Sequence, residues 1–178
     1  MKHLRNYLAF YIPIVIILVI IIFFLWYLLT SASNQNISNK SLMGQAVKVL
    51  SRDHVPDRTK IQYNSNPPAA GAHYAQPQDA GIYTVPPADG HLVHSLEHGA
   101  IILWYNPNEL SKEQITQLEN IFKSISLDKK IMTPLINLDV PIALTSWGRI
   151  IKLKSIDEKQ IKSFFETNYD RGPEQAPI

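Results

Sequence analysis

A long apolar run near the start of the chain constrains its architecture more than any other feature. Residues 7–29 read YLAFYIPIVIILVIIIFFLWYLL and contain no charged side chain. About 20 apolar residues in a helix are enough to cross the hydrocarbon core of a bilayer. The run therefore predicts one transmembrane helix, which leaves residues 1–6 as a short tail. Aromatic residues, which favour the membrane–water interface, lie towards both ends of the run: Tyr7, Tyr11, Trp26 and Tyr27.

The charges around this run predict its orientation. Lys2 and Arg5 precede it, and the next basic residue is Lys40. Basic residues concentrate on the cytoplasmic side of a span, so we expect a cytoplasmic N-terminus and a single-pass protein of the plasma membrane whose remaining residues are extracytoplasmic. The run is longer than the core of an ordinary signal peptide, which favours an uncleaved anchor. Cleavage near residues 30–32 is the alternative.

The composition of the remainder excludes several classes of site. Two of the 17 Lys and Arg residues precede the run, which leaves 15 basic against 15 acidic side chains. This balance gives no reason to expect a nucleic-acid partner, and the membrane, contacted through residues 7–29, is the one partner that the sequence predicts. The chain has no cysteine, so disulfides and thiolate metal ligands are excluded.

Residues after the run predict a polar tether, 30–41, followed by one α+β domain, 42–178. Ser111 with Gln114 makes a capping box before an apolar stripe of helical spacing, and Asp157 caps a second such stripe. The fold class expected is a small mixed or antiparallel sheet with two amphipathic helices, preceded by one transmembrane helix. The expected helices are 111–125 and 157–169, and the expected strands are 100–105, 130–136, 141–147 and 150–154. A short helix or strand over 42–50 and a short strand over 60–63 are also expected.

Residues 64–90 have no hydrophobic periodicity and are rich in proline and glycine, which disfavour regular structure. A loop of this length is usually functional or disordered. Because its aromatic residues favour burial, we expect an ordered loop laid over the domain.

Three of the six histidines and one carboxylate lie in a single nine-residue segment, His91-Leu92-Val93-His94-Ser95-Leu96-Glu97-His98-Gly99. Asp89-Gly90 can open a helix here and Gly99 can close it. At about 100° per residue, His91, His94 and His98 share one face and the aliphatic side chains share the other. We expect the aliphatic face to dock on the sheet and the imidazoles to face outward. Glu97 lies beside them, and His73 in the preceding loop can close over them.

Imidazole is the commonest protein ligand for divalent transition metals. Two histidines four residues apart, with another histidine or a carboxylate from a loop, suit Zn²⁺, Cu²⁺ or an iron bound by two histidines and one carboxylate. The predicted metal ligands are therefore His73, His94 and His98, with Glu97 or His91. Two alternatives stay open. The histidines can anchor loop carbonyls in a non-catalytic cell-envelope scaffold, or the pattern H-x-x-E-H over 94–98 can mark a zinc hydrolase with Glu97 as general base.

Three segments together resemble one known family. They are Tyr63-Asn64-Ser65-Asn66-Pro67-Pro68 with Gly71 and His73-Tyr74, then Leu92 to Gly99 followed by a strand, and then Leu144-Thr145-Ser146-Trp147-Gly148-Arg149 with a closing Pro173-Glu174. Over residues 50–175 the chain resembles DUF3105, a family of uncharacterised, membrane-anchored prokaryotic proteins. The resemblance implies one N-terminal span, an exported domain, and a recurring pattern that includes His73, His94, Glu97 and His98. It implies no activity.

Overall fold

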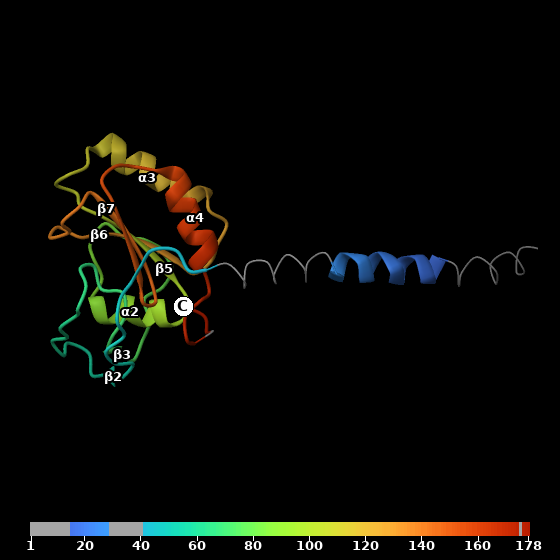
Figure 1. Ribbon diagram of the computed structural model, residues 1–178, viewed down its shortest axis with the longest axis horizontal. Helices are drawn as coiled ribbons and strands as arrows, with labels where there is room; N and C mark the ends of the chain where they lie inside the picture. The colour runs from blue at the N-terminus through green and yellow to red at the C-terminus, as the bar shows by residue number, and fades with distance from the viewer. Residues whose placement is uncertain (1–14, 29–40, 175) are drawn as a thin grey trace, which may run out of the picture. The chain divides into compact units, whose positions relative to one another are not determined.

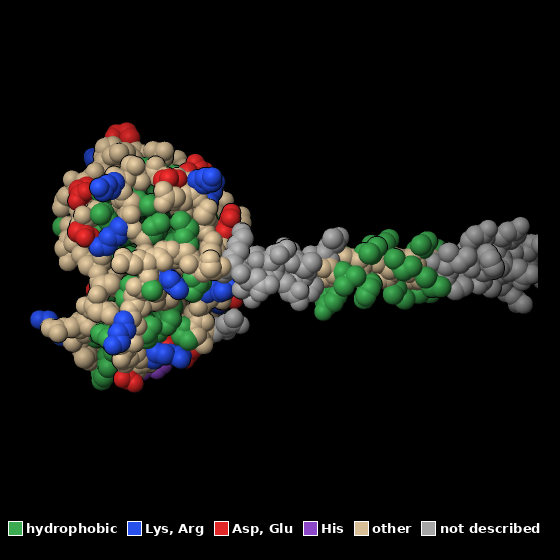
Figure 2. Space-filling view, viewed as in Figure 1, with side chains coloured by type: hydrophobic (Ala, Val, Ile, Leu, Met, Phe, Trp, Pro, Cys, Tyr) green, Lys and Arg blue, Asp and Glu red, His purple; other side chains and the backbone are tan. Residues whose placement is uncertain are grey.

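The computed structural model describes residues 15–28, 41–174 and 176–178. The chain divides into two units, Met1–Lys40 and Ser41–Ile178. In the first unit, residues 15–28 are helical (Figure 1), and every side chain from Val15 to Leu28 is apolar and exposed (Figure 2). Within the described residues, no helix combines the length and the hydropathy needed to cross a bilayer. The rest of the predicted span, the tail 1–6 and residues 30–40 of the predicted tether lie outside the described residues.

The second unit is built on a mixed six-stranded sheet with the order β1-β8-β7-β5-β6-β4. Strand β5 lies inside the sheet, parallel to β6 and antiparallel to β7, and all five of its residues are buried. The prediction of a central strand at 100–105 is confirmed, as is a mixed sheet in an α+β domain. The strands are β1 Gln45–Ala46, β4 Gly81–Ile82, β5 Ile101–Tyr105, β6 Lys130–Pro134, β7 Ile142–Ser146 and β8 Arg149–Leu153.

Two amphipathic helices cover one face of this sheet (Figure 1): α3, Lys112–Ser124, and α4, Glu158–Asn168. Ser111 and Gln114 form the predicted capping box at the start of α3. The Asp157 side chain accepts a hydrogen bond from the Gln160 backbone at the start of α4. Both helices therefore begin where their capping residues predict.

The alternation of side chains along β5 separates two cores. Ile101 and Leu103 pack with α3 and α4 on one face. Ile102 and Trp104 pack on the other face with a third helix, α2, Asp89–Glu97. Successive residues of a strand point to opposite faces of the sheet, so β5 is the wall between the two cores.

The loop 64–90 is ordered and contributes two short strands, β3 and the edge strand β4. Strand β3, His73–Tyr74, is parallel to β2, His54–Val55. This small ladder lies beside α2 (Figure 1). The prediction of a strand over 60–63 is wrong, since these described residues form none. Tyr63 instead donates its hydroxyl to the Ala72 carbonyl, so a side-chain contact fixes this segment. Of the helix or strand expected over 42–50, the structure forms only the two-residue strand β1.

Candidate metal centre

Helix α2 forms as the sequence predicts, but the histidine face is not exposed. Gly99, with φ +87°, follows the helix and ends it. Leu92 and Leu96 are fully buried against the sheet, yet His94 and Glu97 are only 4% and 1% exposed. The expectation of outward-facing imidazoles is therefore wrong. The β2–β3 ladder and the C-terminal segment cover that face, and these contacts leave no signal in the helix itself.

The β2–β3 ladder places a second histidine beside His73. His54 lies directly opposite His73 in the parallel pairing, and directly paired residues project to the same face of a ladder. The ring centroids of His54, His73 and His94 are 4.7, 4.9 and 4.8 Å apart. Three imidazoles from β2, β3 and α2 thus form a nearly equilateral triangle.

In His73, His94 and His98, one ring nitrogen is fixed by a backbone carbonyl. A carbonyl oxygen can only accept a hydrogen bond, so each of these Nδ1 atoms must carry the proton. In a neutral ring this leaves Nε2 with a free lone pair, the form that binds a metal ion. The contacts are His73 Nδ1 to Gly71 O at 2.9 Å, His94 Nδ1 to Tyr74 O at 2.7 Å and His98 Nδ1 to Pro177 O at 2.7 Å.

The free Nε2 atoms point at acceptors rather than donors. His94 Nε2 lies 3.0 Å from His98 Nε2. His73 Nε2 lies 2.9 Å from Glu97 Oε2, within ion-pair range, but the two are not aligned for a hydrogen bond. Among the described residues His73 Nε2, which is fully buried, has no hydrogen-bond partner at all. The lone pairs of these rings therefore face one another and the Glu97 carboxylate, an arrangement that attracts a cation.

Arg52 orients the buried carboxylate. Its Nε donates to Glu97 Oε1 at 2.8 Å, and the Arg52 side chain is half exposed. Since the guanidinium occupies Oε1, Glu97 Oε2 is the oxygen turned towards His73. This arrangement, in which an outer residue positions a ligand, is typical of metal sites.

The distances are compatible with a metal ion. One ligand atom from each of His54, His73, His94 and Glu97 lies within 4.8 Å of the other three. A tetrahedral ion with bonds of 2.0–2.1 Å separates its ligand atoms by about 3.3 Å. These four residues, hereafter the inner group, could hold a metal ion. A second set, His94, His98 and Glu174, meets the same condition and is called the outer group.

The environment of His94 favours its neutral, metal-binding form. Burial lowers the pKa of the His94 imidazole below its usual value. The hydrogen bond to the Tyr74 carbonyl opposes this shift, and the neighbouring rings of His73, His98 and His54 add to it. A proton competes with a metal ion for the same lone pair, so a lowered pKa removes a competitor near neutral pH.

The structure brings together most of the residues singled out from the sequence. His73, His94 and Glu97 lie in the inner group, and His98 lies in the outer group. His91 belongs to neither. Its Nδ1 contacts Gln76 O at 2.7 Å, and its Nε2 is 3.9 Å from an Asp57 carboxylate oxygen.

Three contributors escaped the sequence reasoning: His54, Glu174 and Arg52. His54 sits in a two-residue strand, which has no periodicity to recognise. Its one signal is that it is the remaining histidine of the predicted domain. Glu174 and Arg52 become neighbours of the site only through the fold.

The family model described as "Protein of unknown function (DUF3105)" matches residues 54–177. The chain belongs to the DUF3105 family. The predicted family is thereby confirmed, and the match includes every residue of the inner and outer groups. No curated protein and no solved structure matches this DUF3105 chain.

Proposed function

We propose that this DUF3105 domain binds a divalent first-row transition-metal ion through His54, His73, His94 and Glu97. The observation that carries the proposal is the His73 Nε2 atom, which is buried, has no hydrogen-bond partner among the described residues, and faces Glu97 Oε2 at 2.9 Å. A buried polar atom without a partner costs about 1–3 kcal/mol. An ion bonded to both atoms would remove that cost.

A purely structural role accounts for only half of each ring. Through Nδ1, His94 and His98 do anchor carbonyls of neighbouring segments, as in the scaffold alternative, and His73 holds the Gly71 carbonyl of its own loop. Anchoring gives no reason for ring nitrogens of His54, His73 and His94 to gather within 4.8 Å of one Glu97 carboxylate oxygen. Metal binding uses the nitrogen that anchoring leaves free, so the two roles are compatible in one residue.

The ligand chemistry favours Zn²⁺ or Cu²⁺. Three imidazoles and a carboxylate are nitrogen and oxygen donors of intermediate softness. Soft thiolate ligands are excluded because the chain has no cysteine, and Met132 lies in the core on the other side of the sheet. Four protein ligands fill a tetrahedral shell, whereas catalytic zinc sites keep one position for water. Glu97 is also held by Arg52, which suits a ligand better than a general base, so binding is favoured over hydrolysis.

Calorimetry on the full-length chain in detergent tests this proposal, with Zn²⁺ and Cu²⁺ titrated separately. We expect one ion per chain, and at least about tenfold weaker binding in Glu97→Gln and His94→Gln, the scale of loss seen when a metal site is perturbed. His91→Gln is the matched control, because it lies on the same helix outside both groups, and it should bind like the wild type. No binding by the wild type, or equal binding by His94→Gln, would reject the metal site and leave the anchoring role.

A membrane anchor is proposed on separate grounds. The run 7–29 is uncharged, its described part exposes only apolar side chains, and Lys2 and Arg5 precede it. These features favour a single-pass anchor that holds the domain outside the plasma membrane. Protease treatment of intact and lysed cells tests it: a C-terminal tag should be cleaved in intact cells, and protection of that tag would refute the orientation.

A further inference from the structure

The outer group shares one ligand with the inner group, and this overlap carries a further inference. We infer that His98, Glu174 and His94 form a second, loading position through which the ion enters and leaves the inner group. The inference rests on the proposed metal binding and adds a route to it.

The outer group has the same design as the inner one. His98 Nδ1 is held by the Pro177 carbonyl at 2.7 Å, so Nε2 is its free nitrogen. That atom lies 3.0 Å from His94 Nε2 and 3.6 Å from Glu174 Oε2. Two imidazole lone pairs and a carboxylate oxygen therefore face one another, as in the inner group.

Arg52 links the carboxylates of the two groups. Its guanidinium lies 2.8 Å from Glu97 Oε1 and 3.8 Å from Glu174 Oε1. In both residues Oε1 faces the arginine and Oε2 faces a histidine Nε2. One half-exposed cation thus orients two carboxylates towards two adjacent positions for an ion.

The backbone fixes Glu174 beside the end of α2. The Glu174 amide donates to the Glu97 carbonyl at 3.1 Å, and the Asp170 amide donates to the Gly99 carbonyl at 2.9 Å. A Cβ on Gly172 would lie 2.1 Å from the Glu97 carbonyl oxygen, so only glycine permits this approach. The placement of the outer carboxylate therefore follows from close backbone packing.

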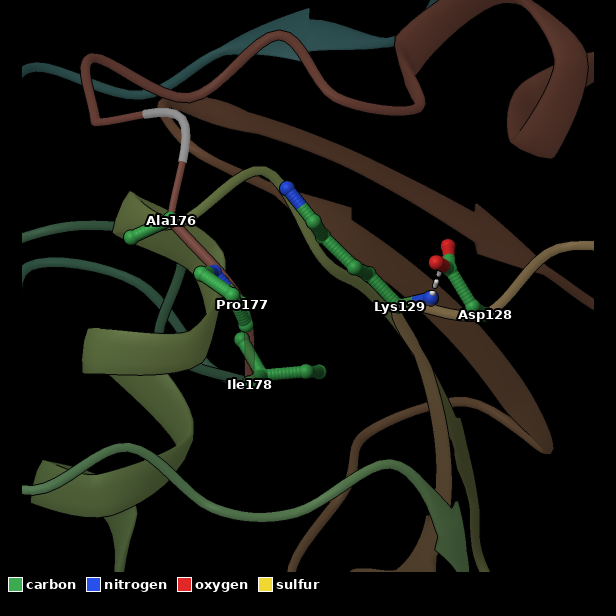
Figure 3. A pocket seen from close by; sticks show the side chains of 5 residues that line it. All are labelled: Asp128, Lys129, Ala176, Pro177 and Ile178. Atoms are coloured by element: carbon green, nitrogen blue, oxygen red, sulfur yellow. Dashed lines mark hydrogen bonds between the residues drawn. The ribbon is translucent and has the colours of Figure 1, made fainter.

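Residues 176–178 also lie beside the outer group, where the Pro177 carbonyl contacts His98 Nδ1. A hollow of about 250 Å³ lies next to the outer group, lined by Asp128, Lys129, Ala176, Pro177 and Ile178 (Figure 3). Lys129 Nζ donates to the His98 carbonyl at 3.1 Å and pairs with Asp170 at 2.6 Å. The last residues thus run beside the end of α2, where the Pro177 carbonyl reaches His98.

The shared nitrogen makes the two positions exclusive. His94 Nδ1 is occupied by Tyr74, so Nε2 alone can bind, and it can bind one ion at a time. With bonds of 2.0–2.1 Å, the two ion positions are at most about 4 Å apart. The Glu174 side chain is 45% exposed and that of Glu97 is 1% exposed. An ion can meet Glu174 from solvent and then exchange His98 and Glu174 for the inner ligands without leaving His94.

Stopped-flow kinetics on the full-length chain test the loading position. Zn²⁺ uptake and its release to a chromophoric chelator are measured for wild type, Glu174→Gln and His98→Gln, with the exposed Glu166→Gln as control. A loading position speeds entry and exit alike, so we expect both rate constants to fall by about tenfold in the two variants, the effect of a modestly raised barrier. The ratio of the release rate constant to the uptake rate constant should not change, and neither should the stoichiometry of one ion per chain.

Two outcomes would overturn the inference while leaving metal binding intact. One is wild-type rates in both variants, which would mean that the ion enters past the exposed ring of His54. The other is simultaneous binding of two ions, which would exclude a shared nitrogen. Absence of binding by the wild type would instead reject the proposed function itself.

Discussion

At the scale of single residues, backbone carbonyls decide what the histidines can do. Each carbonyl that accepts from an Nδ1 atom selects one tautomer and points the other nitrogen into the cluster. Two of these contacts, from His94 to the Tyr74 carbonyl and from His98 to the Pro177 carbonyl, also hold the loop 64–90 and the C-terminal segment against the C-terminal half of α2. Orientation of the ligands and attachment of the covering segments are therefore one set of interactions.

The lowered pKa of His94 predicts how stability depends on pH in the metal-free protein. The unfolded His94 titrates near its usual pKa of about 6.5, whereas the folded one titrates lower. Between the two values the unfolded state binds more protons, so the free energy of unfolding decreases as the pH falls below about 6.5. The stabilisation that comes from keeping His94 unprotonated is fully present above that pH. For one group, the free energy of unfolding cannot change by more than about 1.4 kcal/mol per pH unit.

Urea unfolding between pH 7.5 and 5 in the presence of a chelator measures this dependence. The wild type should lose more stability on acidification than His94→Gln, which has no imidazole to protonate at that position. An equal or steeper loss in His94→Gln would contradict the lowered pKa of His94.

At the scale of elements, the C-terminal end of α2 depends on the backbone of another segment. Gly99 has φ +87°, and a Cβ there would lie 2.7 Å from the Asp170 Cα. Gly148, at the β7–β8 turn, has φ +67°, but its Cβ would meet nothing nearer than 3.5 Å. The two glycines therefore share a conformation and differ in the space around them.

Alanine substitutions at these two positions separate strain from contact. Gly148→Ala should cost about 1–2 kcal/mol of unfolding free energy, since it adds only the left-handed conformation. Gly99→Ala should cost about 1–3 kcal/mol more, because overpacking against Asp170 is added. Urea unfolding of both variants measures the difference. Equal losses would mean that the segment after α4 moves freely away from α2.

The elements that the sequence predicts well are those whose signal is local. Capping residues and apolar stripes predict helices α3 and α4, and an unbroken apolar run predicts β5. The β2–β3 ladder could not be predicted, because two-residue strands have no period and their pairing joins residues far apart in sequence. His54 and the burial of His94 depend on that ladder. The candidate ligands on α2 were therefore identified from the sequence, whereas their enclosure was not.

At the scale of the whole domain, an ion in the inner group would tie the exposed strand β2 to β3 and α2, which already pack together. The ladder consists of two-residue strands, and the described backbone hydrogen bond from His73 N to Asp53 O at 3.0 Å joins the same two segments. β2 is the exposed strand of this ladder and β3 is buried, and a short exposed segment such as β2 opens more easily than a buried sheet. An ion shared by His54, His73 and His94 would tie both strands to α2.

Hydrogen exchange of the full-length chain with and without saturating Zn²⁺ measures this cross-link. Opening the ladder would require release of the ion, so at 100 times the dissociation constant the opening becomes about 2.7 kcal/mol more costly. We expect amides at residues 53–55 and 73–74 to exchange about 100-fold more slowly with the ion. Amides in the exposed first turns of α3, which carries no ligand, should exchange by fraying at an unchanged rate. In Glu97→Gln the protection of the ladder should disappear. Equal protection of α3 and the ladder, or none in the ladder when calorimetry shows the ion bound, would show that binding does not link β2 and β3 to α2.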